Sequence, residues 1–429
     1  MIGSAKLAFQ RKSDILSIEK SEVWVTGIGL VSSLGEGLET HWTQLTSGKT
    51  PVPSVDTASQ APYPVHPIVE LEIDSQIPKR SDQRQMGPWQ HLGTYTAGLA
   101  LDDAGIAHNE ELLAATNMIV SAGGGERDIE VDAAIMESLS TADNPGALLN
   151  DSLMNNLRPT LFLAQLSNLM AGNISIVHGV TDSSRTFMGD ELAGVMAVDT
   201  AVAQIQHGQG EIFLVGGAYI AERADMTMLM AMGNTLHQGE HTPVWSRESG
   251  DGGMIMGSAG AFLVLESREH AESRGVKPYA RIDKVVADRC NRQPGTARMT
   301  ADGLLERIAD QLPSGPLPVI SGCCGIQPQL SEEHAFLDSL SSRGVSPAIR
   351  GMTTVIGNTL EAQFPVNVAL ASLAISNGAF FDPFDDSGTE QAFAGSPDQI
   401  LISTWGHWRG ESLALIGKPD VSLRGGTRS

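Results

Sequence analysis

The sequence predicts an α/β protein built from two domain-sized halves. Two observations support this class. The chain has 429 residues, which is long enough for two halves and a large core. It also alternates short apolar runs with segments that carry apolar residues at helical spacing, and glycines separate these segments.

Residues 186–218 are the most informative segment. They predict a sharp turn, a helix, a glycine-containing turn and a buried strand. Small and apolar residues recur at helical spacing over 192–205, and Gly208 marks the end of that helix. The apolar run 212–215 predicts the strand. Free backbone N–H groups and the positive end of the helix dipole meet at the start of such a helix, where they lower the pKa of a thiol nucleophile.

The other elements are predicted from the same pattern of apolar runs and glycine turns. In chain order they are an opening strand at 23–32, a helix that ends at 102–106, a strand and glycine turn at 118–125, a segment before the sharp turn at 159–176, a strand and helix over 251–280, and a final glycine-rich loop and strand at 403–418. Residues 144–156 and 380–396 are rich in Pro, Gly and acidic residues and are predicted to be exposed loops.

Composition excludes several classes of partner. The net charge is −22, and the sequence has no block rich in Lys and Arg. Such a block would be needed to bind the phosphates of nucleic acid or an anionic membrane surface. The sequence contains no run of about 18 apolar residues, so no transmembrane helix is predicted. The first 20 residues are mixed and charged, unlike a secretory signal. The three cysteines are too few for a disulfide scaffold, so we expect a reducing, cytoplasmic location.

The ordered series of glycine motifs resembles the β-ketoacyl-acyl-carrier-protein synthase family over nearly the whole chain. The resemblance implies a thiolase-like fold of five alternating layers, αβαβα, in which two similar halves are related by a pseudo-twofold axis. The halves would span residues 20–275, with the sharp turn at Glu191, and residues 276–429. Members of this family place a catalytic Cys at the sharp turn, called the elbow below. Glu191 occupies that position here.

The resemblance also implies that the two catalytic His residues are missing. Cys324 takes the place of the first His, and Thr354 or Val355 takes the place of the second. Arg350 stands for a family Lys upstream of the second His, and the two side chains are not equivalent. No intact catalytic residue is therefore expected.

The final loop differs from the family in the same region. His407, Trp408 and Arg409 stand where the family has a Phe followed by two glycines. We expect Glu191 to accept hydrogen bonds from Arg409 or His407, because a buried carboxylate needs a partner and Arg offers a planar fork. Such a pair would plug the former acyl pocket. The residues predicted to line that pocket are Glu191, Cys324, Thr354, Val355, His407 and Arg409.

Other chemistry is possible at two residue pairs. Cys323 and Cys324 could act as thiols, or they could be a small apolar pair at the end of a strand. Asp190 and Glu191 could serve as an acid/base pair, or they could simply favour a helix N-terminus. The sequence predicts no cofactor, and no cluster of His residues with the spacing of a metal site is found.

Three functions remain open. The first is a degenerate, chain-length-factor-like subunit that is non-catalytic and pairs with an active 3-oxoacyl-carrier-protein synthase in very-long-chain fatty acid or polyketide-type elongation. The second is an unorthodox but active synthase or malonyl decarboxylase. The third is a homodimeric scaffold that binds acyl-carrier protein.

The expected partners follow from the resemblance. They are an active ketosynthase subunit or a second copy of the chain, with residues 175–177 as the interface strand, and acyl-carrier protein as a further partner. An acidic carrier protein needs a cationic dock. The local candidates are Lys79, Arg80, Arg84, Arg274 and Lys277.

Overall fold

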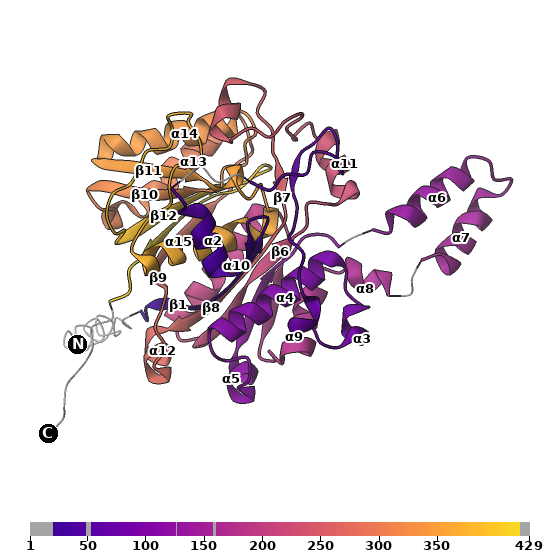
Figure 1. The fold of residues 1–429 in the computed structure, drawn as a ribbon, viewed down its shortest axis with the longest axis horizontal. Helices are drawn as coiled ribbons and strands as arrows, with labels where there is room; N and C mark the ends of the chain where they lie inside the picture. Colours follow the sequence, from indigo (N-terminus) through magenta and orange to yellow (C-terminus); the bar gives the residue numbers. More distant parts are fainter. Residues whose placement is uncertain (1–19, 49–52, 126, 158–159, 421–429) are drawn as a thin grey trace, which may run out of the picture.

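The computed structural model describes residues 20–48, 53–125, 127–157 and 160–420. A large mixed sheet runs through the molecule, and helices cover it on both sides and between its two parts (Figure 1). The strand order is β11-β10-β12-β13-β9-β1-β8-β6-β4-β5, with β2 paired to β1 at the side. A separate pair of short strands, β3 and β7, lies outside this sheet.

The first half of the sheet is formed by five principal strands. In it β1 pairs antiparallel with β8, β8 pairs antiparallel with β6, and β6, β4 and β5 run parallel. The strands of this half and the short pair are β1 (Val23–Ser32), β2 (Gly35–Glu36), β3 (Val65–His66), β4 (Asn117–Ser121), β5 (Ser184–Phe187), β6 (Ile212–Tyr219), β7 (Met256–Gly257) and β8 (Ala259–Ser267).

The second half repeats the first. Its strands β9, β13, β12, β10 and β11 follow the same spatial order and the same sequence of antiparallel and parallel pairings. The two halves join where β1 pairs with β9. This repeat supports the proposed division near residue 275. The strands are β9 (Ala280–Asp288), β10 (Gly315–Ser321), β11 (Val345–Gly351), β12 (Gln399–Trp405) and β13 (Glu411–Gly417).

Five layers result from the way the helices pack. Helices α10 (Glu191–Gln206) and α15 (Gln363–Asn377) pack against each other and contact strands of both halves, so they form the central layer. Helices α4 (Pro88–Asp103) and α9 (Leu169–His178) cover the outer face of the first half, and α13 (Thr296–Glu306) and α14 (Gln329–Ser339) cover the second. The predicted αβαβα architecture is confirmed.

The other helices lie at the periphery. They are α2 (Leu38–Leu45), α3 (Arg80–Gln83), α5 (Glu110–Ala115), α6 (Ile129–Leu139), α7 (Pro145–Asn155), α8 (Leu161–Gln165), α11 (Ala224–Met232) and α12 (Arg268–Arg274). No helix within the described ranges has the length and apolar character needed to cross a membrane.

Two local predictions were wrong, and a third was right only in part. Residues 175–177, predicted as an interface strand, lie inside α9, which ends at Gly179 in the left-handed conformation. Residues 144–156 hold helix α7, because the Asn144 side chain caps the helix start just before Pro145. Residues 380–396 form a loop as predicted, but Phe380, Phe381 and Phe384 of that loop are buried in the central core.

Candidate functional site

The elbow lies between β5 and α10. Gly189 has a φ of +150°, a conformation that favours glycine, and it lets the chain turn sharply after the strand. Helix α10 then begins at Glu191, whose side chain is only 1% exposed. A buried carboxylate therefore lies at the N-terminus of α10, where the helix dipole is positive. Helix α10 itself packs between the two halves of the sheet.

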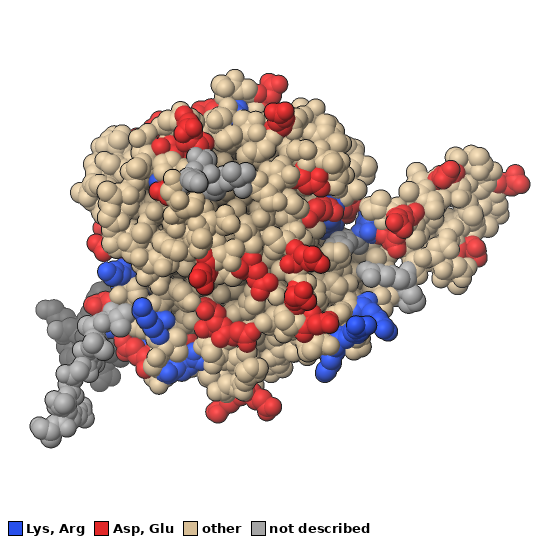
Figure 2. All heavy atoms as spheres, viewed as in Figure 1, with Lys and Arg blue, Asp and Glu red and all other residues tan. Residues whose placement is uncertain are grey.

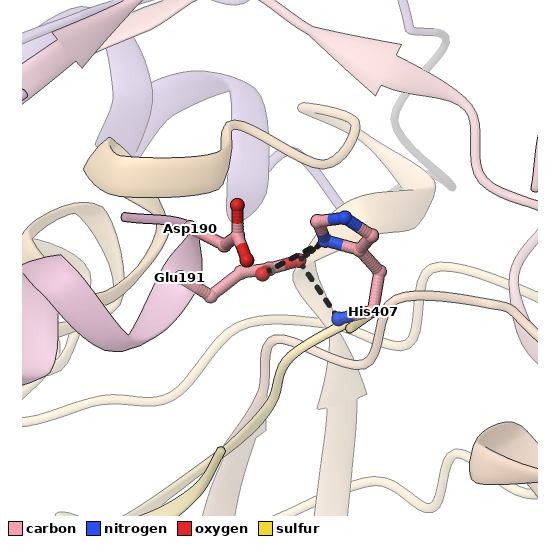
Figure 3. A group of neighbouring side chains, drawn as sticks. All are labelled: Asp190, Glu191 and His407. Carbon is pink, nitrogen blue, oxygen red and sulfur yellow. Dashed lines mark hydrogen bonds and ion pairs between the residues drawn. The ribbon is translucent and has the colours of Figure 1, made fainter. Parts of the chain in front are cut away.

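Glu191 is bound by the loop that follows β12 (Figure 3). The imidazole Nδ1 of His407 lies 3.2 Å from Oε1 and 3.1 Å from Oε2 of Glu191, and the backbone N–H of His407 donates to Oε1 at 3.2 Å. The amide Nδ2 of Asn358 donates to the same Oε1 at 3.1 Å. Of the two partners predicted for Glu191, the structure therefore selects His407.

The two charges stabilise each other. Burial opposes ionisation of Glu191, but the charge and hydrogen bond of His407 bring the pKa of this carboxyl below its ordinary value. Burial also opposes the imidazolium, yet Glu191 raises the pKa of His407 to about 9. The pair is thus a carboxylate and an imidazolium at neutral pH, and His407 is not available as a general base.

The thiols beside this pair are poor nucleophiles. Cys323 and Cys324 are both buried. Burial, with the negative charge of Glu191, raises the pKa of the Cys324 thiol to about 12. The pKa of Cys323 is also raised, mainly by burial. Both side chains remain protonated at neutral pH, as expected for small apolar core residues.

The turn before α15 requires a correction. Asn358, rather than Thr354 or Val355, is the residue of this turn that contacts Glu191. The Thr354 hydroxyl accepts from the Val244 N–H, and Val355 belongs to the central hydrophobic core. The Gly357-Asn358 dipeptide leads into a helix, and we propose Asn358, in place of Thr354 or Val355, for the position of the second family His.

Arg350 does not take part in the site. It is fully buried, and its guanidinium donates to the Phe381 carbonyl at 2.9 and 2.7 Å and to the Gln391 carbonyl at 3.0 Å. Arg350 therefore fixes the 380–396 loop against the second half of the sheet.

Arg292 holds the loop that carries His407. Its Nη2 donates to the Gly406 carbonyl at 2.6 Å, its Nε donates to the Trp408 carbonyl at 3.1 Å, and its Nη1 pairs with the buried carboxylate of Glu411. Arg292 has a φ of +57°, which non-glycine residues seldom adopt. No motif in the sequence indicated a role for Arg292.

Arg409 lies on the exposed side of the same loop. Its side chain and that of Trp408 are exposed, so Arg409 does not take the role proposed for it as a partner of Glu191. Arg409 acts on the elbow through its charge: burial raises the pKa of Asp190 and the charge of Arg409 opposes this rise, whereas His407 binds Glu191 directly.

Glu361 fills space next to the elbow. This residue follows the Asn358 turn, is 5% exposed, and sits so close to Gly123 that a Cβ on that glycine would lie 2.1 Å from Oε1. Burial, with the charges of Asp190 and Glu191, raises the pKa of Glu361 to about 8. The void that Glu361 lines with Tyr219 measures only about 20 Å³, close to the volume that one water occupies.

Asp190, Glu191 and His407 offer one ligand atom each within 4.8 Å of one another. A divalent cation could bridge such a set. Two features oppose a cation here, namely the positive end of α10 and the proton on His407. We therefore interpret this group as an ion pair.

The predicted cationic groups do not form one patch. Lys79, Arg80 and Arg84 are exposed in and around α3, where basic side chains gather in Figure 2. Arg274 ends α12, where it pairs with Glu266 and donates to the Ala104 carbonyl. Among the described residues nominated as a dock, Lys79, Arg80 and Arg84 form one exposed group, and Lys277 is exposed just after α12.

Comparison with known proteins identifies the family. The sequence profile described as "Beta-ketoacyl synthase, N-terminal domain" matches residues 20–271. Because this is more than half of the chain, the protein belongs to the β-ketoacyl synthase family.

Individual relatives agree with this assignment. The chain is 24% identical over 273 residues to 3-oxoacyl-[acyl-carrier-protein] synthase 2 of Vibrio harveyi, covering 62% of each sequence. It spans about 62% of the length of this relative and of the next. It is 25% identical over 372 residues to the oxytetracycline polyketide putative beta-ketoacyl synthase 1 of Streptomyces rimosus, covering 83% of this chain and 85% of that protein.

A solved structure confirms the fold. The ishigamide ketosynthase/chain length factor superimposes with a TM-score of 0.75 at 18% identity, and the match covers 93% of this chain and 100% of that one. The thiolase-like ketosynthase fold predicted from the sequence is therefore correct.

Proposed function

We propose that this chain is a non-catalytic, ketosynthase-like subunit that pairs with an active 3-oxoacyl-carrier-protein synthase. The single observation that carries this proposal is the Glu191–His407 pair at the elbow. The buried Glu191 carboxylate is held in place by hydrogen bonds from His407 and Asn358, and its acyl anhydride would be a poor carrier compared with a thioester. The pair also occupies the position where an acyl chain would be loaded.

Features away from the elbow support pairing. Strand β5 ends the sheet and pairs only with β4 among the described strands, so its outer edge is open. Open strand edges are sites for pairing with another chain. Exposed apolar side chains lie nearby: Ile176, 67% exposed, is on α9, which packs on β5, and Met188, 71% exposed, follows β5 directly. We call the β5 edge with Ile176 and Met188 the pairing face.

The pathway and further partners are part of the proposal. A chain-length-factor-like role in very-long-chain fatty acid or polyketide-type elongation is supported by the likeness to a ketosynthase/chain length factor and to a polyketide synthase component. The exposed cations of the α3 group, Lys79, Arg80 and Arg84, are our candidate dock for acidic acyl-carrier protein.

The test uses malonyl-acyl-carrier protein with a labelled carboxyl group. The isolated chain should release no labelled carbon dioxide above the rate without protein. When it is added to the active synthase that co-purifies with it, the distribution of product chain lengths should change. Release of carbon dioxide by the isolated chain, or no change in product length, would count against the proposal.

One observation favours the alternative of an unorthodox enzyme. Glu361 is a buried carboxyl with a pKa of about 8, and such perturbed groups are frequent in active sites. In the same assay, decarboxylation by the isolated chain that is lost in Glu361→Gln would support this alternative. A rate unaffected by that substitution would exclude Glu361 as the acid.

A further inference from the structure

Helices α6 and α7 and the loop between them project from the body of the protein (Figure 1). We call residues 129–155 the arm. The two helices pack against each other, and among the described elements neither packs extensively against another helix or strand. Only Ile135 and Ser152 of these helices are buried. The arm is therefore almost entirely solvated.

The sequence of the arm favours helix formation, but the arm has little tertiary packing to stabilise its helices. The side chains of Asp128 and Asn144 cap the two helix starts, and Pro145 occupies the first turn of α7. Isolated helices of 11 residues are nevertheless marginal in water. One buried apolar side chain does not offset a backbone entropy cost of about 1–2 kcal/mol per residue. A surface that covers the arm would supply the missing burial.

The exposed chemistry of the arm defines that surface. Met136 is 69% exposed and Met154 is 74% exposed, and Ile129, Leu149 and Leu153 are exposed as well. The arm also carries five carboxylates and no Lys or Arg, and Figure 2 shows acidic but no basic side chains on it. The carboxylates are Glu130, Asp132, Glu137, Asp143 and Asp151.

We propose that the arm docks into an apolar groove, rimmed by Lys and Arg, on the partner synthase. This inference rests on the proposed function. The arm is followed in sequence by α8 and then by α9, which carries Ile176 of the pairing face. A second copy of this chain is a poor occupant, because each copy has a net charge of −22 and would set acidic arm against acidic surface. The arm thus favours a heterologous, basic partner.

Photo-crosslinking in the native cells tests the inference. A photo-crosslinking amino acid replaces one exposed Met at a time, at three positions of the full chain. Met154 probes the arm, Met188 probes the pairing face, and Met299 on α13, 73% exposed, is the matched control. We expect Met154 and Met188 to crosslink a ketosynthase that has an intact Cys-His-His site, with the Met154 crosslink mapping to a segment rich in Lys or Arg. Met299 should give no such product.

The other outcomes separate two kinds of failure. Crosslinks from Met188 but not Met154 overturn the arm as a docking element and leave the pairing intact. Crosslinks from neither position overturn both proposals. A Met154 crosslink to a second copy of this chain, or to a protein of another class, overturns the partner assignment.

Charge is tested with the synthase captured at Met188. The variant E137Q/D143N/D151N should bind it about tenfold more weakly at low salt, and the salt dependence of its Kd should flatten. The control variant E110Q/E111Q/E240Q neutralises the same number of exposed carboxylates elsewhere and should bind as the natural chain does. Equal Kd values for both variants overturn the electrostatic part of the inference.

Discussion

Glu191 is the residue on which the proposed function depends. A helix N-terminus stabilises an anion whether it is a thiolate or a carboxylate, so the elbow keeps its electrostatic character with a different side chain. The difference lies in the neighbours, because His407 and Asn358 donate hydrogen bonds to the carboxylate and hold it in place. These contacts stabilise Glu191 within the fold, and we propose on this basis that the elbow does not attack a substrate.

The ion pair predicts a pH dependence of stability. The pKa of His407 rises from an ordinary 6.5 to about 9 on folding, so its contribution is complete below pH 6.5 and is lost as the pH rises through 9. A shift of this size corresponds to roughly 3 kcal/mol. Glu191→Gln removes the cause of the shift. The difference in free energy of unfolding between the natural chain and this variant should fall by roughly this amount from pH 6 to 9.5 in urea titrations.

The control for this measurement is Glu306→Gln. Glu306 pairs with Arg343 on the surface and should show no such change over the same pH range. Parallel stability curves for the natural chain and Glu191→Gln would contradict the assignment of the ion pair.

Restoring the nucleophile alone should not restore catalysis. In Glu191→Cys the thiol gains the helix dipole, but we propose that Cys324 and Asn358 occupy the positions of the two family His residues, and neither supplies an imidazole. General acid–base groups contribute about 10²–10⁴-fold, so condensation by the single variant should stay below detection with acyl- and malonyl-carrier protein. The triple variant E191C/C324H/N358H is the matched comparison. Condensation by the single variant equal to that of the triple variant would refute the assignment of these positions.

Elements with strong local signals were predicted well. The opening strand, helix α10 and strand β6 appear where apolar periodicity and glycines placed them. Residues 175–177 are apolar enough for a strand, but they continue an α9 that begins upstream and ends at a glycine cap, so local composition was misleading. The buried Phe residues of the 380–396 loop depend on tertiary packing, which composition does not reveal.

Site residues followed the same rule. Glu191 and His407 were predicted as partners and are hydrogen-bonded in the structure, whereas Asn358 lies in a segment that departs from the family pattern. The role of Arg292 could not be predicted from the sequence, because it depends on a positive φ and on carbonyls more than 100 residues away along the chain.

Arg292 is a positioning residue for the loop that carries His407. Arg292→Lys keeps a cation for Glu411 but cannot reach the Gly406 and Trp408 carbonyls together. The loop should loosen, and the pKa of His407 should fall by at least about 1 unit toward its ordinary value as contact with Glu191 weakens. Histidine titration by NMR measures this pKa directly. Arg343→Lys at the surface pair is the control, and an unchanged His407 pKa in folded Arg292→Lys would contradict the role.

At the scale of the whole molecule, the two halves have the same topology but differ in the exposure of their outermost strands. Each half of the sheet ends in a parallel strand, β5 in the first half and β11 in the second. Ile176 and Met188 lie at the β5 end, whereas most of β11 is buried beneath its neighbours. The asymmetry supports association through the first half.

This asymmetry predicts that one exposed side chain controls association. Ile176→Glu places a charge on the pairing face without touching the core, since Ile176 is 67% exposed in the described chain. Surface substitutions of this kind change stability by only about 0.5 kcal/mol, so the thermal midpoint should hold. Burying an unpaired carboxylate at an interface costs several kcal/mol, so sedimentation should show the complex with the synthase dissociating. Met299→Glu should leave the complex intact. Full association by folded Ile176→Glu would place the partner elsewhere on the molecule.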